Sequence, residues 1–305
     1  MAKTHDAMGR AVRWKWPKKV GEVVLTEYDL LIFYQLMRYR YLRRDLLARL
    51  LPPRSANTFP RRLRELFRAR YLMRPESQKF CENAHAQFMY YAIAPKGEEA
   101  LLARQERPLA VTQVRGSSSN FAHDAAGVCN VMASIEAGAR AQGYRLVTLE
   151  EVLDRMKEPP ADPLKFPTII EHRPEKFRPD GFFGLYKEGR VSFFMHEHER
   201  ANGGDVKKLR QASWRKKVLA YQHVFEMEAY KERLGIPNLR VIVTTTSAKK
   251  ARNLAKLTEE LVGPTNRFLF HHVRDLGREA GEDEYPDLFA EEWLRAGREP
   301  TKLVT

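Results

Sequence analysis

Apolar residues recur at helical spacing in three short segments between Leu25 and Arg70. The first segment follows Thr26, which is expected to cap a helix, and the second runs from about 42 to 51, where prolines end it. The third follows the polar run 55–58 and turns three apolar side chains inward, with arginines on its other positions. These patterns predict three short helices.

Residues 71–73 and 88–94 read as strands around a polar loop, and residues 95–104 read as a closing helix. Three helices followed by a hairpin are typical of a winged helix, a DNA-binding helix-turn-helix variant. Residues 105–120 hold a proline, a glycine and three serines without a sustained period, which indicates a linker.

Helices and strands alternate in the remainder, which predicts an α/β layer structure. The expected strands are 145–148, 181–186, 191–198, 239–245 and 267–272. The expected helices are 122–142, a short one ending at 157, 205–234 and 248–261, with a proline-rich loop before the second strand. The last thirty residues are charged, with an expected short helix around 289–295, and can cover an edge of the sheet.

The predicted domain organisation therefore has five parts. They are a basic arm (1–24), a winged helix (25–106), a linker (107–120), a second domain (121–275) and a charged C-terminal segment (276–305).

Charge changes this picture, because the formal net charge is +14 and the pI is about 9.7. Such an excess indicates a polyanionic partner. Residues 38–70 contain eleven arginines, no lysine and two acids, and the arginine fork suits phosphate oxygens and guanine edges. We expect Arg61, Arg62 and Arg64 to face the DNA groove. Further DNA contacts are expected from Arg54, Arg68, Arg74, Lys79, Lys207, Arg210 and Arg215. The alternative is that these cations only solvate the surface.

Two cysteines, Cys81 and Cys129, provide neither a disulfide framework nor a paired zinc motif. No window approaches eighteen uninterrupted apolar residues, and the N-terminal residues lack the apolar core of a signal peptide. We therefore expect a cytoplasmic protein without a membrane partner.

Candidate chemistry lies in the stretch RPDG and in FFMHEHER, residues 178–181 and 193–200. A tight turn, KEGR, joins the two strands that carry them. Alternation along a strand places Glu197 and Glu199 on one face and His196 and His198 on the other. With Asp180 on the neighbouring strand, the acids can bind Mg²⁺ or Mn²⁺ through Asp180 and Glu197. A zinc site of histidine and glutamate on one strand is geometrically awkward.

The order of a PD dipeptide, a hairpin, ExE, a basic helix and another strand resembles the PD-(D/E)xK nuclease core. Together with the predicted winged helix, His123 and Asp124, and Tyr221, the chain is similar to the replication-relaxation family of plasmid and mobile-element proteins over about 25–275. The resemblance implies an α/β fold, α+β overall: a winged helix-turn-helix, then an αβββαβ domain like that of restriction endonucleases. It also implies association with DNA.

The sequence departs from the nuclease pattern where Glu199 replaces the catalytic lysine. An anion in that place disfavours cleavage of phosphodiesters. A lysine from the next helix can substitute, and the candidates are Lys208, Lys216 and Lys217. Asp180, Glu197 and Glu199 complete the candidate catalytic set.

Three functions stay open on these residues. The first is a DNA-binding protein acting in replication, relaxation or transfer, whose nuclease-like domain has lost or altered its lysine and needs no cofactor. The second is an endonuclease, a nickase, that uses Mg²⁺ or Mn²⁺. The third is a transcriptional regulator or a basic scaffold for a protein partner. Expected partners are double-stranded DNA, replication or relaxosome proteins and a second copy in a homodimer.

Overall fold

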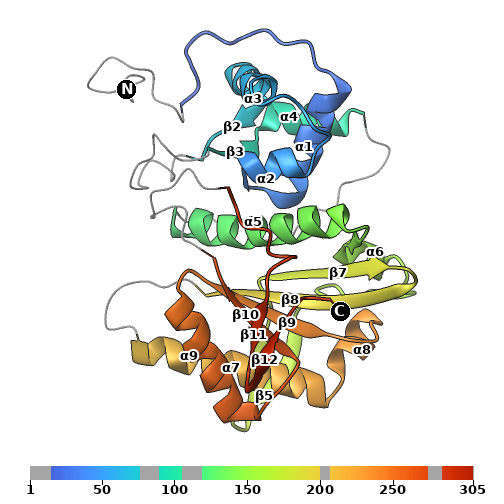
Figure 1. The fold of residues 1–305 in the computed structure, drawn as a ribbon. Coiled ribbons are helices and arrows are strands. Elements are labelled where there is room, and N and C mark those ends of the chain that lie inside the picture. The colour runs from blue at the N-terminus through green and yellow to red at the C-terminus, as the bar shows by residue number, and fades with distance from the viewer. Residues whose placement is uncertain (1–14, 76–88, 105–118, 200–206, 274–283, 305) are drawn as a thin grey trace. The chain divides into compact units, whose positions relative to one another are not determined.

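The computed structural model describes residues 15–75, 89–104, 119–199, 207–273 and 284–304. It has a mixed α/β fold, as the sequence predicts, and divides into two compact units (Figure 1). Unit 1 comprises 1–137 and 275–286, and unit 2 comprises 138–274 and 287–305. The division falls inside helix α5 (Ser119–Ala141). The predicted linker at 107–120 lies almost wholly outside the described residues, so that boundary stays a prediction.

Unit 1 contains small helices around a three-stranded sheet. In chain order these are α1 (Glu27–Tyr39), β1 (Leu42–Arg43), α2 (Arg44–Arg49), α3 (Thr58–Arg68), β2 (Leu72–Met73), β3 (Tyr90–Ile93) and α4 (Pro95–Leu102). The strand order is β1-β3-β2, and β3 is antiparallel to both neighbours. Thr26 caps α1 in a capping box with Asp29, which is the start that the sequence predicts.

One element of unit 1 differs from the expectation. The segment predicted as a single helix over 42–51 begins with β1, because Leu42 and Arg43 pair with Tyr91 and Tyr90. Pairing with a strand some fifty residues later overrides the local helical pattern. Arg43 is buried and its guanidinium binds Asp45 at 2.5 and 2.7 Å.

Unit 2 is built on a seven-stranded sheet of order β12-β11-β10-β9-β8-β7-β4. Its strands are β4 (Arg145–Val147), β7 (Gly181–Lys187), β8 (Arg190–Glu199), β9 (Arg240–Thr245), β10 (Phe268–His272), β11 (Trp293–Arg295) and β12 (Arg298–Thr301). Strands β8, β9 and β10 are parallel, and the other pairs are antiparallel. The helices are α6 (Leu149–Leu153), α7 (Lys207–Glu226), α8 (Ala229–Leu234) and α9 (Ala248–Val262).

The β7–β8 hairpin confirms the tight turn that the sequence predicts. Glu188 and Gly189 at its tip both have positive φ, 51° and 78°. Two such residues match the twist of a two-residue hairpin, and glycine adopts this conformation at low cost. The turn aligns Gly181 with His196, so Asp180 reaches the far end of β8.

Three expectations for unit 2 are wrong. The proline-rich loop contains a separate hairpin, β5 (Phe166–Ile170) and β6 (Arg173–Phe177). The expected helix 205–234 breaks at Glu228, whose φ of 48° lies in the left-handed region, so that α7 and α8 are distinct. The expected helix around 289–295 is instead β11, which pairs with the edge of β10. The C-terminal segment thus covers an edge, but as a hairpin within the main sheet.

The core of unit 2 lies between this sheet and helices α7 and α9 (Figure 1). Trp214 of α7 is fully buried and meets Phe268 and Phe270 of β10 edge to face. From β8 the odd-numbered residues Phe193 and Met195 enter this core. The next odd positions on the same face are Glu197 and Glu199, so the packing of α7 brings helix side chains toward two acids.

Candidate functional site

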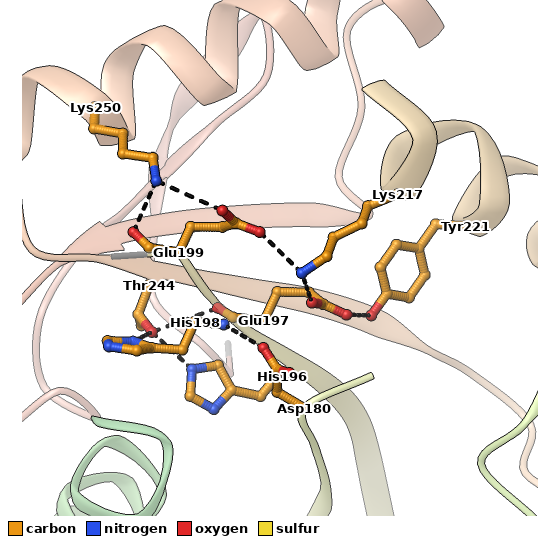
Figure 2. A network of polar contacts seen from close by, with 9 residues as sticks. All are labelled: Asp180, His196, Glu197, His198, Glu199, Lys217, Tyr221, Thr244 and Lys250. Atoms are coloured by element: carbon orange, nitrogen blue, oxygen red, sulfur yellow. Dashed lines mark hydrogen bonds and ion pairs between the residues drawn. The ribbon is translucent and has the colours of Figure 1, made fainter. Parts of the chain in front are cut away.

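The two acids of β8 lie at the carboxyl end of a parallel strand, beside α7. Glu197 is fully buried, and each of its carboxylate oxygens receives a hydrogen bond (Figure 2). Lys217 donates to Oε2 at 2.6 Å and Tyr221 donates to Oε1 at 2.7 Å. Lys217 and Tyr221 are four residues apart, which places both on one face of α7. The helix therefore supplies one cation and one hydroxyl to the same carboxylate.

Burial dominates the proton equilibrium of Glu197. It raises the pKa to about 8, with a contribution from nearby Asp180, while Lys217 and Tyr221 oppose the rise. Burial also works against the ammonium of Lys217, but Glu197, Asp180 and Glu199 outweigh it and raise the pKa of that lysine. Burial and the adjacent carboxylate raise the pKa of Tyr221 well above its ordinary value. Lys217 stays charged across the physiological range.

Glu199 lies between two lysines of different helices. Its Oε1 is 2.9 Å from Nζ of Lys217, and its Oε2 is 3.5 Å from Nζ of Lys250. Lys250, in the first turn of α9, also donates to the backbone oxygen of Glu199 at 3.1 Å. Burial alone raises the pKa of Glu199, but the two lysines outweigh it and hold that pKa below its ordinary value. Glu199 is thus a carboxylate shared by two ammonium groups.

Asp180 precedes β7 and extends its pairing with β8. Its backbone N–H donates to the carbonyl oxygen of His196 at 3.0 Å, and its Oδ2 accepts the backbone N–H of His198 at 2.9 Å. The carboxylate therefore takes the place of a strand partner where the hairpin ends. This contact holds Asp180 close to Glu197, in the neighbourhood that the sequence predicts.

Hydrogen-bond donors already contact most of the oxygens that a divalent cation would use here. Both oxygens of Glu197 already accept hydrogen bonds, one from an ammonium, and one oxygen of Asp180 accepts a backbone amide. A metal ion would have to displace these donors. Among the residues that the structure describes, no three His, Cys, Asp or Glu side chains are grouped as metal ligands.

The histidines of β8 point to the opposite face, as strand alternation predicts. His196 Nε2 and His198 Nδ1 lie 2.7 and 2.9 Å from the hydroxyl oxygen of Thr244 on β9 (Figure 2). Burial, with His198 and Lys217, holds the pKa of His196 well below its ordinary value. The two imidazoles and the Thr244 hydroxyl link β8 to β9 on the face opposite Glu197 and Glu199.

The three lysines that the sequence offers as catalytic candidates differ in where they lie. Lys217 meets both acids, whereas Lys216 is exposed and Lys208 lies outside the residues whose side chains are described. Lys207 and Arg210 also lie outside them, and Arg215 is exposed with Glu171 at 3.5 Å. Lys250 was not predicted. Its position just after a parallel strand, at the start of a helix, is the signal that could have indicated it.

The arginines of α3 in unit 1 fall into an exposed group and one that is paired with a buried acid. Arg61, Arg64 and Arg68 are exposed at i, i+3 and i+7 spacing on α3 and form one face, although Arg61 also pairs with Glu65 at 3.3 Å. Arg62 does not belong to this face. Its guanidinium binds the buried carboxylate of Asp29 at 2.6 and 2.8 Å, which limits its reach, and its groove contact stays a prediction.

Two further predicted contacts have partners within unit 1. Arg54 lies 4.4 Å from the ring centre of Tyr28 and lines a hollow of about 350 Å³ beside Arg61. Arg74 lies 4.2 Å above the ring of Phe67 and donates to the hydroxyl of Tyr91 at 3.1 Å, so packing limits its reach. Lys79, and the loop that holds it, lie outside the described residues. The side chains of His123 and Asp124 are not among those that the structure describes.

Comparison with known proteins adds one match. The replication-relaxation family pattern matches residues 33–239, which is more than half of the chain. The chain belongs to the replication-relaxation family. No curated protein and no solved structure matches.

The matched range of this replication-relaxation protein includes α3 with its arginine face and the cluster of Asp180, Glu197, Glu199 and Lys217. Lys250 and Thr244 lie beyond the match. Within the described ranges, no helix combines the length and apolar composition that spanning a bilayer requires.

Proposed function

We propose that this replication-relaxation protein binds double-stranded DNA through unit 1 and acts in the replication, relaxation or transfer of a plasmid or mobile element. The observation that carries the proposal is the exposed face of Arg61, Arg64 and Arg68 on α3. Arginine guanidinium groups on an exposed helix face can contact backbone phosphates and guanine edges in a major groove. The net charge of +14 supports the same partner.

The element order of unit 1 supports a winged helix. Three helices, with β1 inserted after the first, precede a hairpin in a sheet of order β1-β3-β2. In that fold α3 is the helix that enters the groove. With α6, the β5–β6 hairpin and α8 taken as insertions, the elements α5, β4, β7, β8, α7 and β9 follow the order helix, three strands, helix, strand, which supports a nuclease-like fold.

For unit 2 we propose a DNA-backbone clamp that does not cleave. Glu197 is fully buried and its oxygens accept hydrogen bonds from Lys217 and Tyr221, which disfavours binding of a metal ion or activation of a water molecule there. A basic clamp needs only cations within reach of phosphates. This proposal needs no cofactor.

The test is a titration of fluorescein-labelled duplex DNA, followed by anisotropy at about 50 and about 200 mM salt. Replacing Arg61, Arg64 and Arg68 with alanine should weaken binding at least about tenfold and make its salt dependence shallower. The matched control removes three exposed arginines elsewhere, Arg155, Arg190 and Arg298. If both triple variants lose affinity equally, net charge explains binding and the α3 face does not.

A second candidate is Mg²⁺- or Mn²⁺-dependent nicking of DNA, favoured by the approach of Lys217 to Glu197 at 2.6 Å. The nuclease pattern has its lysine on the strand, where this chain has Glu199, and Lys217 of α7 is placed to substitute for it. Supercoiled plasmid incubated with either metal ion tests it. Nicking that disappears in both Asp180→Ala and Lys217→Ala would establish the enzyme, and nicking that survives both substitutions indicates contamination.

A further inference from the structure

Lys217 and Lys250 come from different helices and meet at a single carboxylate. Figure 2 shows the side chain of Glu199 between their two ammonium groups. Lys217 Nζ lies 2.9 Å from Oε1, and Lys250 Nζ lies 3.5 Å from Oε2. Two lysines held close together repel each other, and a shared anion offsets that repulsion. Glu199 therefore acts as the counter-ion of a two-lysine site.

The site is accessible enough for exchange. The side chains of Lys217, Lys250 and Glu199 are 26, 17 and 15 % exposed, whereas Glu197 beneath them has no exposed surface. Lys217 is anchored from below by Glu197, so its ammonium keeps its position if Glu199 leaves. Lys250 keeps a hydrogen bond to the backbone oxygen of Glu199, which does not depend on the carboxylate.

A carboxylate and a phosphate present similar oxygen acceptors to an ammonium group, at similar distances. We infer that Lys217 and Lys250 form a binding site for a phosphodiester of the DNA backbone, and that the Glu199 carboxylate fills this site until a phosphate displaces it. The inference rests on the proposed DNA binding and adds where unit 2 holds the backbone and what restrains that contact. It also assigns a role to Glu199, which stands where active nucleases have a lysine: its carboxylate competes with the phosphate for Lys217 and Lys250.

Because the Glu199 carboxylate competes with phosphate for the two lysines, it weakens the binding of DNA. Removing its charge should strengthen DNA binding by more than the added net charge does, and the gain should need Lys250. Shortening the side chain should have an intermediate effect, because aspartate keeps the charge and withdraws it from the lysines by one methylene group. These expectations differ from those for a merely structural glutamate, whose loss has no reason to tighten binding.

The experiment uses full-length protein carrying Arg61→Ala, Arg64→Ala and Arg68→Ala, so that contacts of unit 2 dominate the signal. Anisotropy with a short labelled duplex compares this parent with Glu199→Gln, Glu199→Asp and the control Glu232→Gln. Glu232 is an exposed glutamate of α8, and its substitution makes the same change in net charge.

At about 50 mM salt, Glu199→Gln should bind about fivefold more tightly than the parent. Glu199→Asp should bind about twofold more tightly, and Glu232→Gln should change affinity less than twofold. Adding Lys250→Gln to Glu199→Gln should abolish the gain. The inference is overturned if Glu199→Gln binds no more tightly than Glu232→Gln, or if the gain survives the loss of Lys250.

The outcomes for the two proposals are separable. If the parent triple variant binds as tightly as the unsubstituted protein, the α3 proposal fails while the Glu199 comparison can still be read. If the parent loses binding and no Glu199 variant restores any, the α3 proposal stands and the two-lysine site is refuted. Tryptophan emission checks folding, and Glu199→Asp covers the case in which the glutamine variant does not fold.

Discussion

Replacing Lys217 with methionine tests the central contact of unit 2. The substitution keeps the length of the side chain and removes the charge that lies 2.6 Å from the buried carboxylate of Glu197. A buried carboxylate without its partner avoids the cost of charge by holding a proton. The loss of stability should therefore depend on pH, and the structure indicates in which direction.

The protonation of Glu197 determines whether the stability rises or falls with pH. Its pKa is about 8 in the folded protein against an ordinary 4.5, so between these values only the folded state holds that proton. Stability from this group thus falls as pH rises from about 4.5 to 8, and the fall ends there. Without Lys217 the pKa rises further and the fall continues above 8. Lys217 itself adds no slope below 10.5, because it is charged in both states.

The magnitude follows from the linkage slope of about 1.4 kcal/mol per pH unit. At about pH 6.5 the variant should lose only the hydrogen bonds of Lys217, about 1–2 kcal/mol. At about pH 9.5, which is some 1.5 units above the pKa of Glu197, the loss should grow by about a further 2 kcal/mol.

The assay is urea unfolding followed by tryptophan emission. Trp214 and Trp293 are fully buried in unit 2, so the signal reports mainly on that unit. The control is Lys216→Met, an exposed neighbour with the same change in charge, which should change stability by less than about 0.5 kcal/mol at either pH. Equal losses for Lys217→Met at both pH values would refute the reasoning, and so would a pH effect that persists when Glu197→Gln is added.

Two further predictions concern side chains with buried partners. Arg62→Ala should lower the free energy of unfolding by about 2–3 kcal/mol, because the buried carboxylate of Asp29 loses its guanidinium partner. The control Arg64→Ala should change the free energy of unfolding by less than about 0.5 kcal/mol. Thermal melting measures both variants, and equal losses of stability would contradict this prediction. Tyr221→Phe should cost about 1–3 kcal/mol, since one oxygen of a fully buried carboxylate loses its donor, and Tyr186→Phe at a partly exposed position is the matched control in urea unfolding.

Local pattern was enough to predict most elements and the two faces of β8. Successive side chains of residues 193–199 point to opposite faces of the sheet, and the structure confirms that the glutamates lie opposite the histidines. Alternation requires no knowledge of distant residues, because each peptide unit of a strand reverses the side-chain direction. The expected helix at 289–295 was wrong because pairing with β10, not local spacing, decides the conformation there.

Arg62 illustrates what the sequence of a single helix does not predict, namely the partner of a charged side chain. It lies three residues after Phe59 and four before Leu66, both buried, so the helix pattern itself places it beside the inward face. That signal was available. What the segment alone did not contain was the partner, a carboxylate thirty-three residues earlier in the chain. An arginine can be buried only with such a partner, and three-dimensional packing decides whether one is present.

The sequence by itself determined the composition of the candidate site: an acid before one strand, two acids on the next, and several lysines on the helix that follows. Only the tertiary structure decided which lysine reaches the acids, because that depends on how α7 rotates about its axis when Trp214 packs against β10. It also brought in Lys250, which lies fifty-one residues from Glu199 and approaches it only because β8 and β9 are parallel neighbours. Residue type follows from sequence, but proximity between distant segments follows from the burial of apolar surface that no single segment contains.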